Sequence, residues 1–149
     1  MRYRMKGKRF DEFIVGTEFI TASRTVTETD VVMFMYLSGD FNPLHNNEEY
    51  MRESQFKTRI VQGVLTLAIA EGLANQLGIF EGTTMAVLSK TTRFKAPVFF
   101  GDTLTLKLKV LEKKESKKPD RGVITFEALV FNQKDVNVLE GEWAILISR

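Results

Sequence analysis

Apolar and polar residues follow two different patterns along the chain. From Thr83 onward apolar residues recur with a period of two, in segments rich in Val, Leu, Ile, Phe and Thr. These predicted strands are Met85–Phe94, Thr103–Leu111, Gly122–Phe131 and Val136–Ile147. Near the start, the apolar residues around Gly16 predict a first strand over Phe13–Arg24 with an irregular beginning. The second half of the chain is therefore predicted to form a sheet.

Helical signals lie between the first strand and the others. Thr27–Asp30 fits a capping box, and apolar residues then recur at helical spacing until Gly39 ends the helix. Asn47, followed by two glutamates, predicts a short helix that ends near Ser54. The segment from Gly63 to Gly78 is apolar around most of its circumference, which is typical of a helix buried inside a domain.

Strands before and after one long buried helix predict an α+β fold, with an antiparallel sheet wrapped around the helix. The chain has no internal repeat, low-complexity tract or long linker. Its 149 residues, of which 44% are apolar, suffice for one hydrophobic core. We therefore expect a single domain over residues 1–149.

Composition argues against several kinds of function. The 21 basic and 19 acidic residues nearly balance, which disfavours a nucleic-acid partner. Cysteine is absent, so disulfides, thiolate nucleophiles and thiolate metal ligands are excluded. No apolar run reaches the roughly 18 residues of a membrane span, and the basic start, Met1–Phe10, lacks the apolar stretch of a secretory signal. We expect a cytoplasmic protein without a membrane partner.

Basic residues gather locally between Lys107 and Arg121, around Ser116 and the Pro119-Asp120 pair. We interpret them as the solvated tip of a hairpin, because charged residues commonly collect at turns. The alternative is a loose electrostatic landing site for an anionic carrier.

The segment from Tyr36 to His45 concentrates an acid, a base and an amide within ten residues. Pro43 disfavours helix at Asn42, so we expect Gly39–His45 to form a fixed turn. Asp40 and His45, the only histidine, can then converge on one water molecule and exchange protons with it without a metal. The alternative is that Asp40 caps the backbone of its own turn and His45 is a packing residue.

Gly63 stands where an extended segment enters the long helix. The first N–H groups of a helix have no intrahelical partner and can donate to a carbonyl oxygen that gains negative charge, such as that of a thioester. The alternative is that Gly63 only permits close packing at the start of the helix.

Three motifs resemble those of the MaoC-like, or R-specific, enoyl-CoA hydratase family. They are Tyr36–His45, Ile60–Thr66 with its glycine at the start of the central helix, and Arg93–Val98 followed by Gly101–Leu104. The motifs occur in family order and frame most of the chain, from Thr25 to Leu111. The resemblance implies a hot-dog fold and a homodimer whose sheets pair edge to edge.

The resemblance also implies a reaction, the reversible syn addition of water to a trans-2-enoyl-CoA to give an (R)-3-hydroxyacyl-CoA. Asp40 and His45 match the catalytic pair of the family, and Gly63 matches its oxyanion amide. The substrate-binding residues are expected to be Asn42, which would also hold the turn, Gln62 and Val64. The reaction needs no cofactor, and the acyl carrier is either CoA or an acyl carrier protein.

Two positions depart from the family pattern. Gln62 stands where the family often has histidine, and Glu71 stands where it often has serine. We interpret Glu71 as a carboxylate that is satisfied at a dimer interface or faces solvent. The alternative is that Glu71 is the catalytic carboxylate of a hot-dog acyl-CoA thioesterase. A third hypothesis is a non-catalytic acyl-CoA-binding subunit that pairs with a second hot-dog protein.

Overall fold

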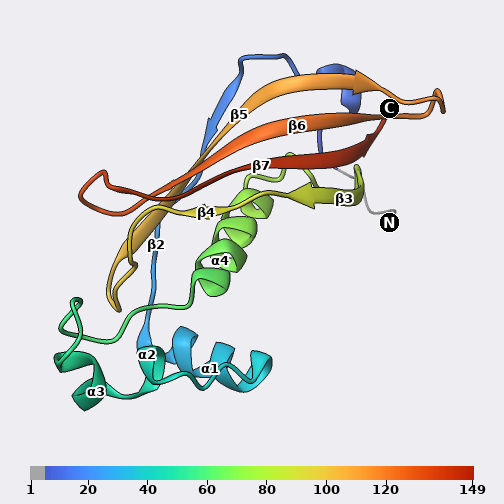
Figure 1. Ribbon diagram of the computed structural model, residues 1–149. Coiled ribbons are helices and arrows are strands. Elements are labelled where there is room, and N and C mark those ends of the chain that lie inside the picture. The colour runs from blue at the N-terminus through green and yellow to red at the C-terminus, as the bar shows by residue number, and fades with distance from the viewer. Residues whose placement is uncertain (1–5) are drawn as a thin grey trace.

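The computed structural model describes residues 6–149. The expectation about a secretory signal rests partly on residues 1–5, which lie outside the described part. In chain order the elements are η1 (Phe10–Glu12), β1 (Glu18–Ile20), β2 (Arg24–Thr25), α1 (Glu28–Ser38), α2 (Pro43–Asn46), α3 (Glu48–Arg52), α4 (Gly63–Gln76), β3 (Thr84–Lys90), β4 (Arg93–Phe94), β5 (Thr103–Glu115), β6 (Arg121–Phe131) and β7 (Asn137–Ser148) (Figure 1). None of the helices described is both long enough and apolar enough to cross a membrane.

The strands form one curved antiparallel sheet in the order β1-β5-β6-β7-β3, with β2 paired to β5 and β4 paired to β7. The period of two in the sequence explains the sheet, because alternate residues of β5 and β6 point inward and are buried. Leu106, Leu108 and Phe126 are fully buried examples. Both long strands were predicted from the sequence, although β5 continues to Glu115, beyond the predicted end at Leu111.

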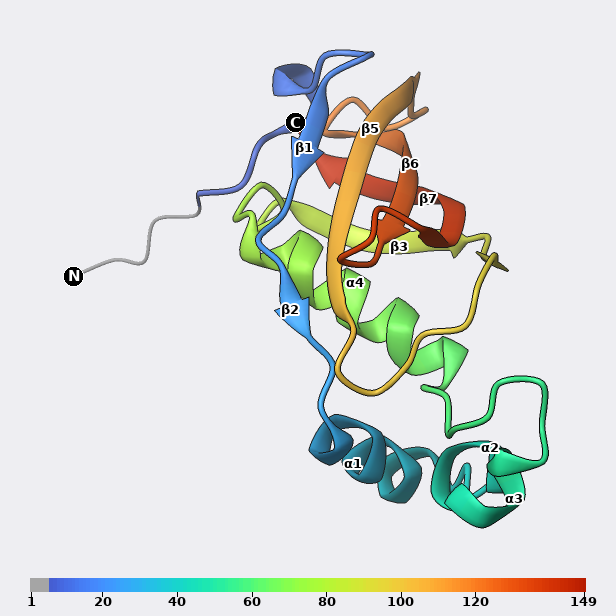
Figure 2. The ribbon, with the colours of Figure 1, turned by 90° about the vertical axis from the view of Figure 1, so that its left-hand side faces the viewer.

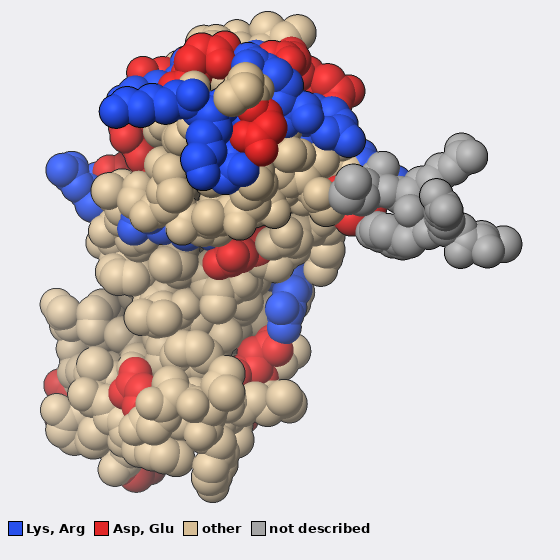
Figure 3. Space-filling model, turned by 90° about the vertical axis from the view of Figure 1, so that its right-hand side faces the viewer, with Lys and Arg blue, Asp and Glu red and all other residues tan. Residues whose placement is uncertain are grey.

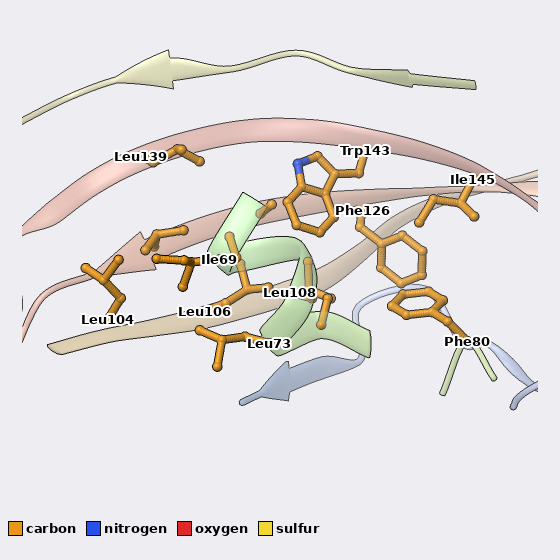
Figure 4. Packing of buried hydrophobic residues seen from close by; sticks show 14 of the residues in the cluster. Ile69, Leu73, Phe80, Leu104, Leu106, Leu108, Phe126, Leu139, Trp143 and Ile145 are labelled. Atoms are coloured by element: carbon orange, nitrogen blue, oxygen red, sulfur yellow. The ribbon is translucent and has the colours of Figure 1, made fainter. Parts of the chain in front are cut away.

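Helix α4 lies in the concave face of the sheet (Figures 1 and 2). Its Ile69 and Leu73 side chains belong to the same buried cluster as Phe126 and Trp143 of the sheet (Figure 4). Burying one such side chain stabilises the fold by roughly 1.5–3 kcal/mol. The predicted α+β arrangement of a sheet around a helix is therefore confirmed.

One stripe of α4 is not buried, contrary to the expectation of a helix enclosed by the domain. Exposed residues recur along one face of the helix at Val64, Ala68, Glu71 and Asn75, and the last residue of the helix, Gln76, is exposed as well. The sheet covers only one side of the helix, and this stripe stays exposed to solvent among residues 6–149. A single chain therefore leaves part of its central helix open.

Helices α1, α2 and α3 form a separate helical arm, residues 28–52, which lies beyond the N-terminal end of α4 (Figures 1 and 2). The arm follows β2 and returns to the body of the protein through the segment that leads to Gly63. The expected helices after Thr27 and Asn47 are both present. The arm carries the candidate acid and base, so its attachment to α4 decides the geometry of the site.

Two predicted strands are wrong in their extent. The expected first strand over Phe13–Arg24 is reduced to the short β1 and β2, preceded by η1. The expected strand Met85–Phe94 is divided into β3 and β4. At this break the carbonyl oxygen of Thr91 would lie 1.9 Å from a Cβ atom at Gly141, so only glycine at position 141 leaves room for this close approach of the two backbones. The sequence pattern shows which residues are apolar but not this close approach.

Candidate active site

The end of α1 sets the position of Asp40. Gly39 has a left-handed φ of 78°, and its N–H donates to the Met35 carbonyl at 2.8 Å. The hydroxyl of Ser38 then accepts from the Asp40 backbone N–H at 3.2 Å. This tight helix end turns the chain sharply and holds the Asp40 backbone in place.

A second short helix places His45. The Asn42 side-chain oxygen accepts from the Leu44 N–H at 3.1 Å, and Pro43 occupies the first turn. Asn42 itself is not helical, as predicted, but the expected turn ends there rather than at His45. The reason is that proline is well suited to the first helical position, where its missing N–H costs nothing. Pro43 therefore starts helix α2, which carries His45.

The imidazole of His45 bridges the helical arm and the segment before α4. Its Nδ1 lies 2.7 Å from the carbonyl oxygen of Ile60. A carbonyl oxygen can only accept, so this contact requires the proton on Nδ1. In the neutral ring Nε2 is then an acceptor, and it lies 3.5 Å from Asp40 Oδ2. The side chain of His45 is buried, whereas that of Asp40 is 43% exposed.

This geometry suits a shared water molecule. A carboxylate oxygen and an unprotonated imidazole nitrogen both accept hydrogen bonds, and 3.5 Å is longer than a direct hydrogen bond. A water molecule that contacts both atoms can donate one hydrogen to each. Asp40 Oδ1 meanwhile accepts from the Asn42 N–H at 3.3 Å. Asp40 thus caps its own turn and also faces His45, so the two interpretations of this residue are compatible.

The N-terminus of α4 supplies free backbone donors. Thr66 N–H donates to the Gln62 carbonyl at 3.1 Å, which begins the helix, and no side chain caps it. The N–H groups of Gly63 and Val64 therefore have no intrahelical partner. Ile60, which anchors His45, lies only three residues before Gly63. The candidate base and the candidate oxyanion amide are thus held by one short segment.

The remaining predicted site residues differ in their surroundings. Val64 is 60% exposed at the first turn of α4. The side-chain oxygen of Asn42 caps the N-terminus of α2. Gln62 is 2% exposed, and its amide nitrogen donates weakly to the Val31 carbonyl at 3.4 Å. Its Oε1 is buried without a hydrogen-bond partner among the described residues. Contact of these three residues with a substrate stays a prediction.

A cavity of about 430 Å³ adjoins the start of α4. Its lining includes Ile60, Gly63 and Val64, but neither Asp40 nor His45. The acid and base are therefore not part of the cavity lining, but His45 is hydrogen-bonded to Ile60, which is. Within residues 6–149 no group of His, Cys, Asp and Glu side chains has the arrangement of a metal site.

Arg59 is a functional candidate that sequence reasoning missed. Its guanidinium donates to Glu28 of α1 and to Glu48 of α3, each at 2.8 Å, and lies 4.7 Å from the centre of the Phe100 ring. The hydrogen bond to Glu28 raises the pKa of Arg59, and the hydrogen bond from Arg59 lowers the pKa of Glu48. Arg59 therefore stays charged and ties the helical arm to the body of the protein. Glu28 and Arg59 are 31 residues apart, so no local charge pattern in the sequence indicates this ion pair.

Glu71 lies two helical turns beyond Gly63, about 12 Å along α4. Its carboxylate is 3.1 Å from Lys90 Nζ, which itself lies 3.7 Å from the centre of the Trp143 ring. Burial lowers the pKa of Lys90, and the contact with Glu71 opposes this shift. Glu71 is thus paired with a cation on β3 and is half exposed, which agrees with the interpretation as a satisfied carboxylate.

The basic residues near the hairpin tip lie far from this site. β5 has 13 residues and runs about 40 Å from Thr103, beside the start of the helical arm, to the hairpin tip. Charged side chains gather at this upper end of the molecule, whereas the lower part shows few (Figure 3). Several of the cations have local partners, such as Lys107 with Glu18 and Arg121 with Asp120. The solvated hairpin tip is therefore the better interpretation.

Comparisons with known proteins identify the family and the fold of the chain. The sequence model of the family described as MaoC like domain matches residues 12–131. The chain therefore belongs to the MaoC-like dehydratase family, as its motifs predicted. It is 34% identical over 148 residues to the uncharacterized protein YdeM of Bacillus subtilis, covering 95% of this chain and 99% of that protein. It is 33% identical over 126 residues to the (R)-specific enoyl-CoA hydratase of Rhodospirillum rubrum, covering 84% and 82% of the two chains.

The fold is the predicted hot-dog fold. A solved structure of the Mycobacterium tuberculosis protein RV0216, described as a double hotdog fold, superposes with a TM-score of 0.86 at 18% identity. The superposition covers 98% of this chain and 46% of that one, so this chain corresponds to one hot-dog unit. At this identity the likeness concerns the fold alone.

Replacing Arg59 with methionine should loosen the helical arm. Methionine keeps an apolar stem over Phe100 but removes both ion pairs, so we expect faster amide hydrogen exchange in α1 to α3. Because ion pairs with exposed partners contribute only about 0–1 kcal/mol each, the melting temperature should fall by only a few degrees. Arg52→Met is the control, because Arg52 contacts only its neighbour Glu49 on the surface of α3. Equal exchange in the two variants would show that Arg59 does not hold the arm.

Proposed function

We propose that this protein is an (R)-specific enoyl-CoA hydratase, which in the reverse direction dehydrates 3-hydroxyacyl thioesters. The observation that carries the proposal is the bond from His45 Nδ1 to Ile60, which leaves Nε2 facing Asp40 and ties the pair to the segment that leads to the free amides of α4. An acid, a base and an oxyanion donor are what the hydration of a conjugated thioester requires, and this bond joins the two segments that carry them. The relatives named as hydratases support the same reaction.

In the proposed step, the thioester carbonyl accepts from the N–H groups at Gly63 and Val64, which makes Cβ electrophilic. The water oxygen bonds to Cβ while one water proton passes to the Asp40–His45 pair. The enolate-like charge collects on the carbonyl oxygen, where the positive end of the α4 dipole stabilises it. The pair then returns a proton to Cα, so one water molecule is added and the enzyme is restored. No cofactor takes part in this step.

The thioesterase alternative finds less support. Glu71 is paired with Lys90 and lies about two helical turns from the amides at Gly63. A carboxylate in an ion pair is a weaker base for activating water than one that faces an imidazole across a gap. We therefore keep the hydratase as the proposal and use thiol release as a control.

We further propose that two copies of the chain form the working unit. β3 is an edge strand with exposed apolar residues Met85, Val87 and Leu88, and an unpaired edge favours pairing with another strand. The open stripe of α4 is joined to the same edge through the Glu71–Lys90 pair. A second copy that extends the sheet through β3 would cover both surfaces together.

The Asp40→Asn variant tests the acid–base pair. The side chain keeps its shape but loses its basicity, so hydration of crotonyl-CoA and longer enoyl-CoAs should fall by about 10²–10⁴-fold. The measurement is loss of the conjugated double bond, with chiral analysis of the 3-hydroxyacyl product. Asp120→Asn at the hairpin tip is the matched control and should keep full activity.

Several outcomes would contradict the proposal that the protein is a hydratase. Full activity of Asp40→Asn would remove Asp40 from the chemistry. Release of free thiol without hydration by the unaltered protein would favour a thioesterase, and Glu71→Gln would then be the informative variant. Binding of acyl-CoA without any turnover would favour a binding subunit.

The Leu88→Lys variant tests the dimer. A lysine in the middle of the β3 edge opposes pairing between sheets, so it should convert a dimer of twice 17.0 kDa into a monomer in sedimentation experiments. Ile20→Lys on β1, at the other edge of the sheet, is the control and should stay dimeric. A monomeric unaltered protein, or dissociation by Ile20→Lys alone, would place the interface elsewhere or exclude it.

A further inference from the structure

Phe94 lies directly against the glycine at the start of α4. Its β4 backbone pairs with Leu139 of β7, while its ring reaches across to α4. A Cβ atom at Gly63 would lie 2.7 Å from the ring, so glycine is the residue that leaves room for this contact. The Phe94 side chain is nevertheless 56% exposed, so only one side of the ring is packed. Phe94 is therefore held through its backbone and its contact with Gly63, while more than half of its surface is open to solvent.

Phe94 is also a wall of the cavity beside α4. The cavity measures about 430 Å³, and its walls are mainly apolar, with Ile60, Val61, Val64, Val98 and Val138 beside Phe94. For scale, an apolar protein cavity of about 150 Å³ holds one benzene molecule. The space therefore exceeds what the single methyl group of a crotonyl chain would fill. Its lining suits a saturated hydrocarbon tail.

We infer that Phe94 determines which acyl chain lengths this protein accepts. The inference rests on the proposed function, because it places the thioester carbonyl at the amides of Gly63 and Val64. From that position the alkyl tail enters the apolar cavity beneath the Phe94 ring. The ring limits the length of the tail because it forms one wall of the cavity and takes up room that methylene groups would otherwise fill. Phe94 is thus a specificity residue, whereas Asp40 and His45 act on the reacting carbons regardless of the length of the tail.

The test compares Phe94→Ala and Phe94→Trp with the unaltered protein. We would measure kcat/KM for crotonyl-, hexenoyl-, octenoyl-, decenoyl- and dodecenoyl-CoA. Phe94→Ala should raise the ratio of decenoyl to crotonyl activity about tenfold, and Phe94→Trp should lower it by a similar factor, as expected when a pocket gains or loses room for methylene groups. Tyr50→Ala, which truncates an exposed aromatic residue of α3, is the control and should leave the ratio unchanged.

A second series distinguishes the tail from the thiol side of the substrate. The same enoyl groups are offered as N-acetylcysteamine thioesters, and the chain-length effect of Phe94→Ala should persist. If Phe94→Ala altered only the preference for CoA over N-acetylcysteamine, Phe94 would contact the carrier and the inference would be wrong. Unchanged chain-length ratios in both Phe94 variants would also overturn it.

A binding measurement separates this inference from the proposed function. Calorimetry with saturated acyl-CoAs of the same lengths reports on the cavity without any turnover. If the unaltered protein hydrated no enoyl thioester, the proposed function would fail. The Phe94 variants would still be expected to shift the chain length that binds most tightly, and the absence of that shift would refute the role of Phe94 separately.

Discussion

The hydrogen bond from His45 Nδ1 to the Ile60 carbonyl is the interaction on which the site depends. It joins the helical arm to the segment that begins α4, so it brings together two parts of the chain that fold as separate elements. It also fixes the proton on Nδ1, because the carbonyl oxygen cannot donate. In the neutral ring Nε2 is then an acceptor, and it faces Asp40. One 2.7 Å contact thus sets the position of the imidazole and the tautomer of its neutral form.

Several surrounding contacts restrain the residues that make the His45–Ile60 hydrogen bond. Ser38 and Gly39 hold the backbone that leads to Asp40, and Asn42 caps the short helix that carries His45. Arg59 ties α1 and α3 together across the same segment. Each contact is modest by itself, but all of them restrain the same arm. The site is therefore built from backbone caps and one charged clamp rather than from a buried network of side chains.

Asp40 and Glu71 have different partners in the fold, and these partners affect what each carboxylate can do chemically. Asp40 faces the imidazole of His45 across 3.5 Å and is partly open to solvent, so its surroundings allow proton transfer. Glu71 contacts the Lys90 ammonium, which in turn lies over the ring of Trp143. Both residues are acidic in the sequence, but Asp40 follows α1 and Glu71 lies within α4. The partner that the fold gives each carboxylate, an imidazole or an ammonium group, is what distinguishes them.

The sequence by itself determined the α+β class, the long strands β5 and β6 and the helix from Gly63, because these follow from local period. Spacing allowed Asp40 and His45 to meet, and the family motif favoured it, but the 3.5 Å approach of their side chains comes from the tertiary structure. Tertiary structure alone decided the break between β3 and β4, the open stripe of α4, the clamp at Arg59 and the contact of Phe94 with Gly63. These features depend on residues far apart in the chain, such as Glu28 with Arg59. A local pattern records burial and turn preference, but it does not record which distant surface a side chain meets.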